Sequence, residues 1–168
     1  MTRIHESPGS ARRSNISLVV LIAVFFYGLW ELWHAATVTN DTTAYLFGVI
    51  FVGGALYGAR VTLAEARDLV NTFDLDPETG KTLISLWRPF HMKRIETSID
   101  RVTDWRHWVQ TGPRKQLSHY LLARTPFHDG MLRFAMQPGM EIKDEFRRIA
   151  PKAIKEFERE TGIVVEKR

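Results

Sequence analysis

The stretch NISLVVLIAVFFYGLWELWHAATVTNDTTAYLFGVIFVGGALYGAR, residues 15–60, decides how this chain is organised. It contains two apolar runs, residues 16–33 and 44–59, which are separated by a short polar segment. A helix needs about 20 apolar residues to cross a bilayer, and the second run reaches that length with the flanking Thr43 and Val61. Helices are expected because lipid cannot satisfy open backbone groups. The stretch therefore predicts a two-helix transmembrane hairpin over residues 15–60.

A cleaved signal peptide followed by a single anchor is the alternative interpretation of the two runs. The first run follows arginines, as the hydrophobic part of a signal peptide does. It is longer than the usual 7–15 residues, however, and residues 34–36 (HAA) make only a weak cleavage site. A second apolar run follows at once, which favours the hairpin.

The positions of the basic residues predict the orientation of the hairpin. The polar segment 34–43 has no Lys or Arg. Basic residues lie instead outside the two runs, namely Arg3, Arg12, Arg13, Arg60 and Arg67. Because cationic flanks stay on the cytoplasmic side, we expect an integral protein of the cytoplasmic (inner) membrane with both termini in the cytoplasm. Residues 1–14 are polar and are predicted to be a disordered cytoplasmic tail.

Composition excludes several classes of function. The 168 residues include no cysteine, so disulfides, thiol catalysis and cysteine-ligated metals are excluded. The net charge of +4 is too small an excess to indicate a nucleic-acid partner. It suits a domain held beside an anionic lipid leaflet.

The chain after residue 60 changes from helical to strand-like patterning. Residues 61–68 form a helix-compatible bridge without Gly or Pro, and residues 69–162 are predicted to form one α+β domain. Alternating apolar residues and strong turn signals predict antiparallel strands. The expected strands are residues 69–76, 81–87, a short strand and a longer one within 95–111 with a bend near Asp100, 117–125 and 131–137. Residues 163–168 form a tail, with a brief strand expected at 163–165.

An amphipathic helix is predicted over residues 140–160. Its apolar face recurs at steps of three and four and consists of Ile142, Phe146, Ile149, Ala153 and Phe157. We expect this face to close one end of the sheet. Pro151 interrupts the pattern: either the helix bends there, or a second helix begins with Pro151 at its first position.

The segment 96–109 resembles a known family. Its residues Ile99-Asp100-Arg101-Val102-Thr103-Asp104-Trp105 look like a motif of bacterial pleckstrin-homology-like domains, which often follow a two-helix membrane hairpin. The resemblance covers about residues 69–160 and implies a bent antiparallel sheet or barrel with a C-terminal helix. The chain departs from the family at Trp105, where a small aliphatic residue is usual, and at Pro151 in the last helix. The family has no shared catalytic residues, so none is assigned here.

Two groups of residues are candidates for interaction. Gly54 and Gly58 form a G-x-x-x-G pair, which permits close helix approach within the hairpin, in a homo-oligomer or against a larger membrane complex. Five basic residues in two turn regions are expected to face the inner leaflet or an acidic partner: Arg88, Lys93, Arg94, Arg114 and Lys115.

Motifs for catalysis and cofactor binding are not found in the sequence. There is no P-loop, G-x-G-x-x-G or H-E-x-x-H, and no metal site or cofactor is predicted. His107 and His119 could meet across strands, although ordinary packing is the simpler role. The sequence therefore predicts a non-enzymatic, membrane-anchored scaffold or accessory subunit with a protein partner or larger membrane complex. The alternative is a small cofactor-binding or catalytic subunit with a site near Glu31 and His34.

Overall fold

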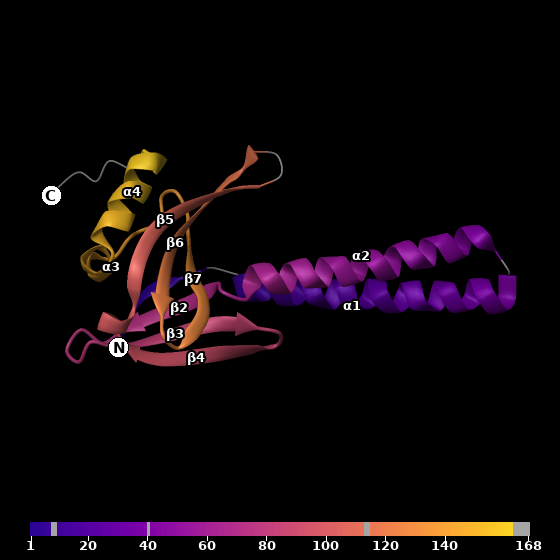
Figure 1. Cartoon of the computed structure of the whole chain (residues 1–168), viewed down its shortest axis with the longest axis horizontal. Helices are drawn as coiled ribbons and strands as arrows, with labels where there is room; N and C mark the ends of the chain where they lie inside the picture. Colours follow the sequence, from indigo (N-terminus) through magenta and orange to yellow (C-terminus); the bar gives the residue numbers. More distant parts are fainter. Residues whose placement is uncertain (8–9, 40, 113–114, 163–168) are drawn as a thin grey trace. The chain divides into compact units, whose positions relative to one another are not determined.

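The computed structural model describes residues 1–7, 10–39, 41–112 and 115–162 (Figure 1). The described residues divide into two compact units. One unit is a pair of long helices, and the other is an α+β domain. The domain takes its first strand from the start of the chain and the rest from Asp68 onward.

The helical unit consists of α1 (Ser10–His34), a π-helical turn (Ala35–Thr39) and α2 (Thr42–Ala66). Asp41 caps α2, and its carboxylate accepts a hydrogen bond from the backbone of Thr43 at 2.8 Å. Such a cap satisfies one of the free N–H groups at a helix start. The predicted helical bridge 61–68 is largely a continuation of α2, which ends at Ala66.

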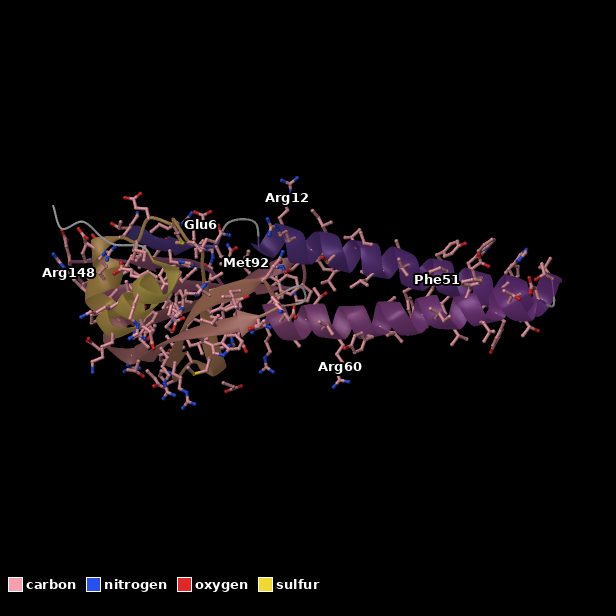
Figure 2. All side chains as sticks on the ribbon, turned by 90° about the horizontal axis from the view of Figure 1, so that it is seen from above. Glu6, Arg12, Phe51, Arg60, Met92 and Arg148 are labelled. Atoms are coloured by element: carbon pink, nitrogen blue, oxygen red, sulfur yellow. The ribbon has the colours of Figure 1, made fainter. Side chains whose placement is uncertain are left out.

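Both helices are long and apolar enough to cross a bilayer. Their most apolar segments have mean hydropathies of 2.0 and 1.6, and only 11% of each segment is buried. Helices in the core of a soluble protein would bury most of such a segment, whereas side chains such as Phe26 and Ile50 are more than 60% exposed here. Length, composition and exposure together suggest membrane insertion. Figure 2 shows Arg12 and Arg60 extending outward near the same end of the helix pair.

The domain contains a four-stranded and a three-stranded antiparallel sheet. Sheet A has the order β1-β2-β3-β4, and sheet B has the order β5-β6-β7. The short helix η2 (Ile99–Arg101) joins the sheets, and an isolated parallel bridge pairs Leu69 with Arg133. The strands are β1 (Thr2–Glu6), β2 (Val70–Leu75), β3 (Lys81–Arg88), β4 (His91–Ser98), β5 (Thr103–Thr111), β6 (Leu117–Thr125) and β7 (His128–Met136).

The expectation of a disordered tail over residues 1–14 is wrong for its first part. Thr2–Glu6 forms β1, which pairs with β2, and α1 already begins at Ser10. A register shift between Arg3 and His5 lets the neighbouring Ile4 and His5 both be buried. This bulge removes the alternating pattern that predicts a strand, so the segment looks polar and irregular in the sequence. The hairpin consequently lies between two strands of the domain and does not precede it.

Two short helices follow the sheets in place of one. They are α3 (Asp144–Ile149) and α4 (Pro151–Thr161), so the alternative in which Pro151 begins a new helix is confirmed. Proline is favoured at a first helical position because its missing N–H would have no partner there. Gly162 ends α4 with φ 68°, a left-handed conformation that glycine adopts without strain. Arg147 of α3 also forms an ion pair with Glu158 of α4.

The core of the domain lies between the two sheets and the C-terminal helices. Phe73, Phe134, Phe146 and Phe157 are fully buried, while Ile142 and Ile149 are partly buried against them. Trp105 belongs to this cluster. The centroid of its ring lies 5.1 Å from that of Phe134, and its indole N–H donates to the carbonyl of Val102. The strand expected at residues 163–165 lies outside the described residues.

Candidate functional site

The β3–β4 hairpin carries three of the five predicted basic residues. Arg88 lies opposite His91 in the strand register at the tip of the hairpin. Lys93 and Arg94 are exposed on β4. The sequence pattern predicts Lys93 and Arg94 in a turn region, but both belong to strand β4. Phe90 forms the tip with φ 62° and is 63% exposed, and the nearby Met92 is also exposed. The hairpin end therefore combines positive charge with two accessible apolar side chains.

The other predicted basic turn follows β5. Lys115 is exposed and adopts φ 58°, whereas Arg114 lies outside the described residues. Trp108 of β5 and Leu117 of β6 are large exposed apolar residues in the same part of sheet B. Figure 1 shows the β3–β4 turn and the C-terminal end of β5 extending to the same side of the domain.

Strand register places the β3–β4 turn at the end of sheet A where β1 ends and β2 begins. The chain leaves the sheet after β1, where the Ser7 amide donates to the carbonyl of Asn71, and returns at Val70. Val70 pairs with Leu86, two residues before Arg88. The basic and apolar turn is therefore at the sheet end from which both connections to the helices depart.

The glycines that allow close contact between α1 and α2 are only partly those predicted. A side chain at Gly58 would meet Leu21 at 2.8 Å, while a side chain at Gly54 would meet no atom within 4 Å. Gly28 and Gly48 also lie at close contacts; an added Cβ at Gly48 would be 2.7 Å from Leu32. Gly58 therefore packs within the pair and Gly54 faces outward. A role for Gly54 in self-association stays a prediction.

Glu31 and His34, the alternative cofactor site, have local partners. The Tyr27 hydroxyl donates to the Glu31 carboxylate at 2.5 Å. The His34 ring stacks on Trp30 with 5.2 Å between ring centroids. Among the described residues, metal-ligating side chains gather elsewhere, at His107, His119 and Glu160.

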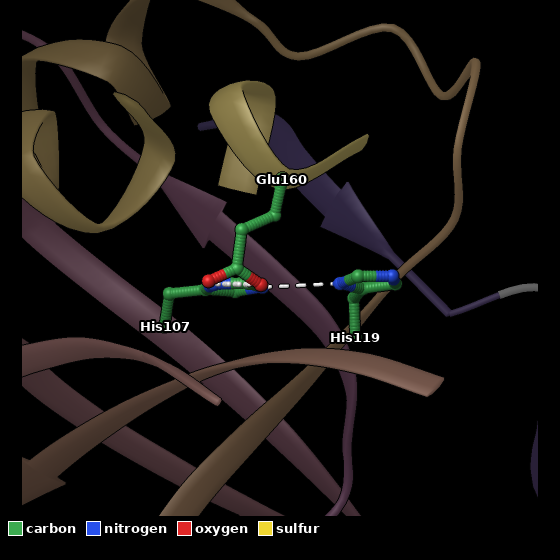
Figure 3. Close-up of side chains that lie close together, drawn as sticks. All are labelled: His107, His119 and Glu160. Atoms are coloured by element: carbon green, nitrogen blue, oxygen red, sulfur yellow. Dashed lines mark hydrogen bonds and ion pairs between the residues drawn. The ribbon is translucent and has the colours of Figure 1, made fainter. Parts of the chain in front are cut away.

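His107 and His119 lie on the same face of sheet B, on neighbouring strands (Figure 3). His107 Nε2 is 3.2 Å from His119 Nδ1. The ring planes differ by 4° and the centroids are 5.4 Å apart, so the rings lie edge to edge in nearly one plane. In this geometry one neutral imidazole donates to the other. Glu160 of α4 approaches from above, with its carboxylate 3.6 Å from His107 Nδ1.

Both imidazoles are covered by α4. Phe157 contacts the two rings edge to face, with centroid distances of 5.7 and 5.6 Å. Burial lowers the pKa of His107; Glu160 opposes this shift, His119 adds to it, and Glu156 weakly opposes it. Burial therefore favours the neutral form of His107, which has a lone pair available to a hydrogen or a metal ion.

The sequence indicated only part of this cluster. His107 and His119 lie in the two segments that flank the predicted turn at residues 112–115, which is why a meeting across strands could be anticipated. Glu160 could not be anticipated, because its position depends on how α4 packs on sheet B. No protein family, curated protein or solved structure matches the chain, so the geometry alone carries the functional interpretation.

Proposed function

We propose that this protein is a non-enzymatic, membrane-anchored interaction module. Its two helices cross the membrane as a hairpin, and its α+β domain works at the cytoplasmic surface. The observation that carries the proposal is the place of the helices in the chain, between the neighbouring strands β1 and β2. The apolar exterior of both helices supports a lipid environment.

The pairing of β1 with β2 supports a hairpin rather than a single span. The two strands belong to one sheet, so the chain must return to the side of the membrane that it left. Two crossings meet this requirement. Removal of the first helix as a signal peptide would take β1 with it, together with the buried Ile4 and His5. Arg12 and Arg60 at one end of the pair favour the cytoplasm as that side.

The domain architecture supports membership of the pleckstrin-homology superfold. A four-stranded sheet, a three-stranded sheet and a C-terminal helix follow one another in the order expected for it. The chain would differ in having its membrane hairpin inserted after the first strand.

The β3–β4 turn would contact the anionic inner leaflet. It lies at the sheet end from which the chain departs toward the helices. Phe90 and Met92 offer apolar surface for the headgroup region, and Arg88, Lys93 and Arg94 offer charge. Each basic residue near such a leaflet contributes about 1 kcal/mol, an attraction that salt screens.

Orientation can be tested with single cysteines, because the natural chain has none. Thr39→Cys between the helices should react with a membrane-impermeant maleimide only from the outer face, and Lys152→Cys on α4 only from the cytoplasmic face. Labelling of both positions from the same face would refute the hairpin topology.

Leaflet contact can be tested on the full chain in lipid nanodiscs. A polarity-sensitive fluorophore at Phe90→Cys should report an apolar environment with anionic lipid and lose that signal in high salt. The same probe at Glu78→Cys, in the exposed turn between β2 and β3, is the control. Equal signals at Phe90→Cys in anionic and neutral lipid would refute leaflet contact and favour an acidic protein partner.

A further inference from the structure

We propose that His107, His119 and Glu160 bind a divalent transition-metal ion, and that this ion ties the C-terminal helix α4 to sheet B. One ligand atom from each of the three residues lies within 4.8 Å of the others (Figure 3). The site is distinct from the proposed membrane-facing turn and does not depend on it.

The spacing of the two imidazoles suits a shared ion. Zinc–nitrogen bonds of about 2.05 Å at a tetrahedral angle place two ligand nitrogens about 3.3 Å apart. The observed separation between His107 Nε2 and His119 Nδ1 is 3.2 Å. The rings now point at each other along a hydrogen bond, so binding requires them to tilt until both lone pairs meet the ion. The donor ring must also move its proton to its other nitrogen.

The scaffold holds the two histidines while leaving the carboxylate free to adjust. His107 and His119 are on paired strands, with Val109 opposite His119 and Leu121 opposite His107. The side chain of His107 is only 2% exposed, whereas that of Glu160 is 40% exposed. The distance of 3.6 Å from the carboxylate to His107 Nδ1 is longer than a hydrogen bond. Glu160 can therefore swing onto an ion without breaking a strong contact.

The surroundings are compatible with a cation. Phe157 supplies an apolar cover. Glu156 lies near His107, but its carboxylate is 3.9 Å from the guanidinium of Arg159, so these two opposite charges largely offset each other. Lys152 and Lys155 are further basic residues on this exposed side of α4.

The donor set indicates the class of ion. Two imidazole nitrogens and one carboxylate oxygen suit Zn²⁺, Co²⁺ or Ni²⁺, while Mg²⁺ and Ca²⁺ prefer oxygen ligands alone. Three protein ligands leave a fourth position for water or for a group from a partner. The accessible side of the site is the side on which Glu160 lies.

The test uses the full chain in detergent, without a polyhistidine tag and after treatment with a chelator. Titration with Co²⁺ should give one equivalent with the visible absorption of a tetrahedral site, and Zn²⁺ should displace it. His119→Ala should abolish this spectrum. Glu160→Gln, which removes a charged direct ligand, should weaken Co²⁺ binding by at least the roughly 10–100-fold that loss of an outer-shell partner costs. His91→Ala, in the exposed part of β4, should leave it unchanged.

A second measurement separates a bound ion from a folding defect. Zn²⁺ should slow hydrogen exchange of the α4 amides in the parent and in His91→Ala, but not in His119→Ala. Glu160→Gln is the variant least expected to disturb folding, because its side chain is exposed and close to isosteric. Absence of a stoichiometric Co²⁺ spectrum in the parent, or equal affinity in the parent and Glu160→Gln, would overturn the proposal.

Discussion

His5 should make the domain sensitive to acid. Its side chain lies in the core against Phe134 and Phe146, and it is 1% exposed. Within the described ranges neither ring nitrogen has a hydrogen-bond partner. Burial lowers the pKa of His5 from 6.5 to about 4, because the core disfavours the charged imidazolium.

The sign of the effect follows from where the proton binds. Between pH 6.5 and pH 4 the unfolded chain takes up a proton on His5 and the folded chain does not, so acidification favours unfolding. Stability from this residue is present above pH 6.5 and is lost as the pH falls toward 4. The loss should be about 2 kcal/mol from pH 7 to pH 5, and about 3 kcal/mol in full below pH 4.

The comparison that isolates this effect is His5→Leu against the parent. Leucine is similar in volume, does not titrate and removes two unsatisfied polar atoms, so it should be tolerated at pH 7. Urea unfolding at pH 7, 6 and 5 would be followed by tryptophan fluorescence, with Trp30→Phe and Trp33→Phe in all chains so that only domain tryptophans report. The parent should lose about 2 kcal/mol more than His5→Leu. Equal losses would refute the assignment of a buried neutral histidine.

Two further predictions concern packing. Phe146→Ala should lower the free energy of unfolding by about 3–5 kcal/mol in the same urea assay, because it empties a core site, whereas Lys152→Ala on the exposed side of α4 should change it by less than about 0.5 kcal/mol. Similar stabilities for these two variants would contradict the role of α3 in closing the core. Gly48→Leu should lower the thermal stability of the helix pair in detergent, measured by circular dichroism, because Leu32 occupies the space at 2.7 Å; Gly54→Leu, with no atom within 4 Å, should not. An equal loss from both substitutions would show that neither contact is specific.

Much of the domain could be predicted from local pattern. The strand 117–125 was predicted with the bounds of β6, and the bend near Asp100 corresponds to η2, because turn residues and alternation are properties of short segments. The two apolar helices were equally evident from length. Strand β4 was predicted too short, since its first half is charged on both faces at the edge of sheet A. Charged side chains on an edge strand discourage pairing with other chains. They also interrupt the alternation of apolar and polar residues from which a strand is predicted.

The features that escaped prediction depend on contacts between distant parts of the chain. β1 is recognisable only through its partner β2, because a bulge removes its alternation. Glu160 reaches the histidine pair only through the packing of α4 across sheet B. The choice between a bent helix and two helices at Pro151 also required the tertiary structure, as both options satisfy the same apolar spacing.

The pairing of β1 with β2 has a consequence for the synthesis and membrane insertion of the protein. β1 is synthesised before β2. Asp74 of β2, which pairs with Arg3 of β1, lies 71 residues further along the chain. At ordinary rates of translation, Asp74 is synthesised on the order of several seconds after Arg3. If the helices cross the membrane as proposed, sheet A can be completed only after the second helix has returned to the original side. A chain that inserted only one helix would leave β1 on the opposite side of the membrane from β2. The edge of β2 that pairs with β1 would then stay open. Such chains should be degraded preferentially, so completion of the sheet would act as a check on correct membrane insertion.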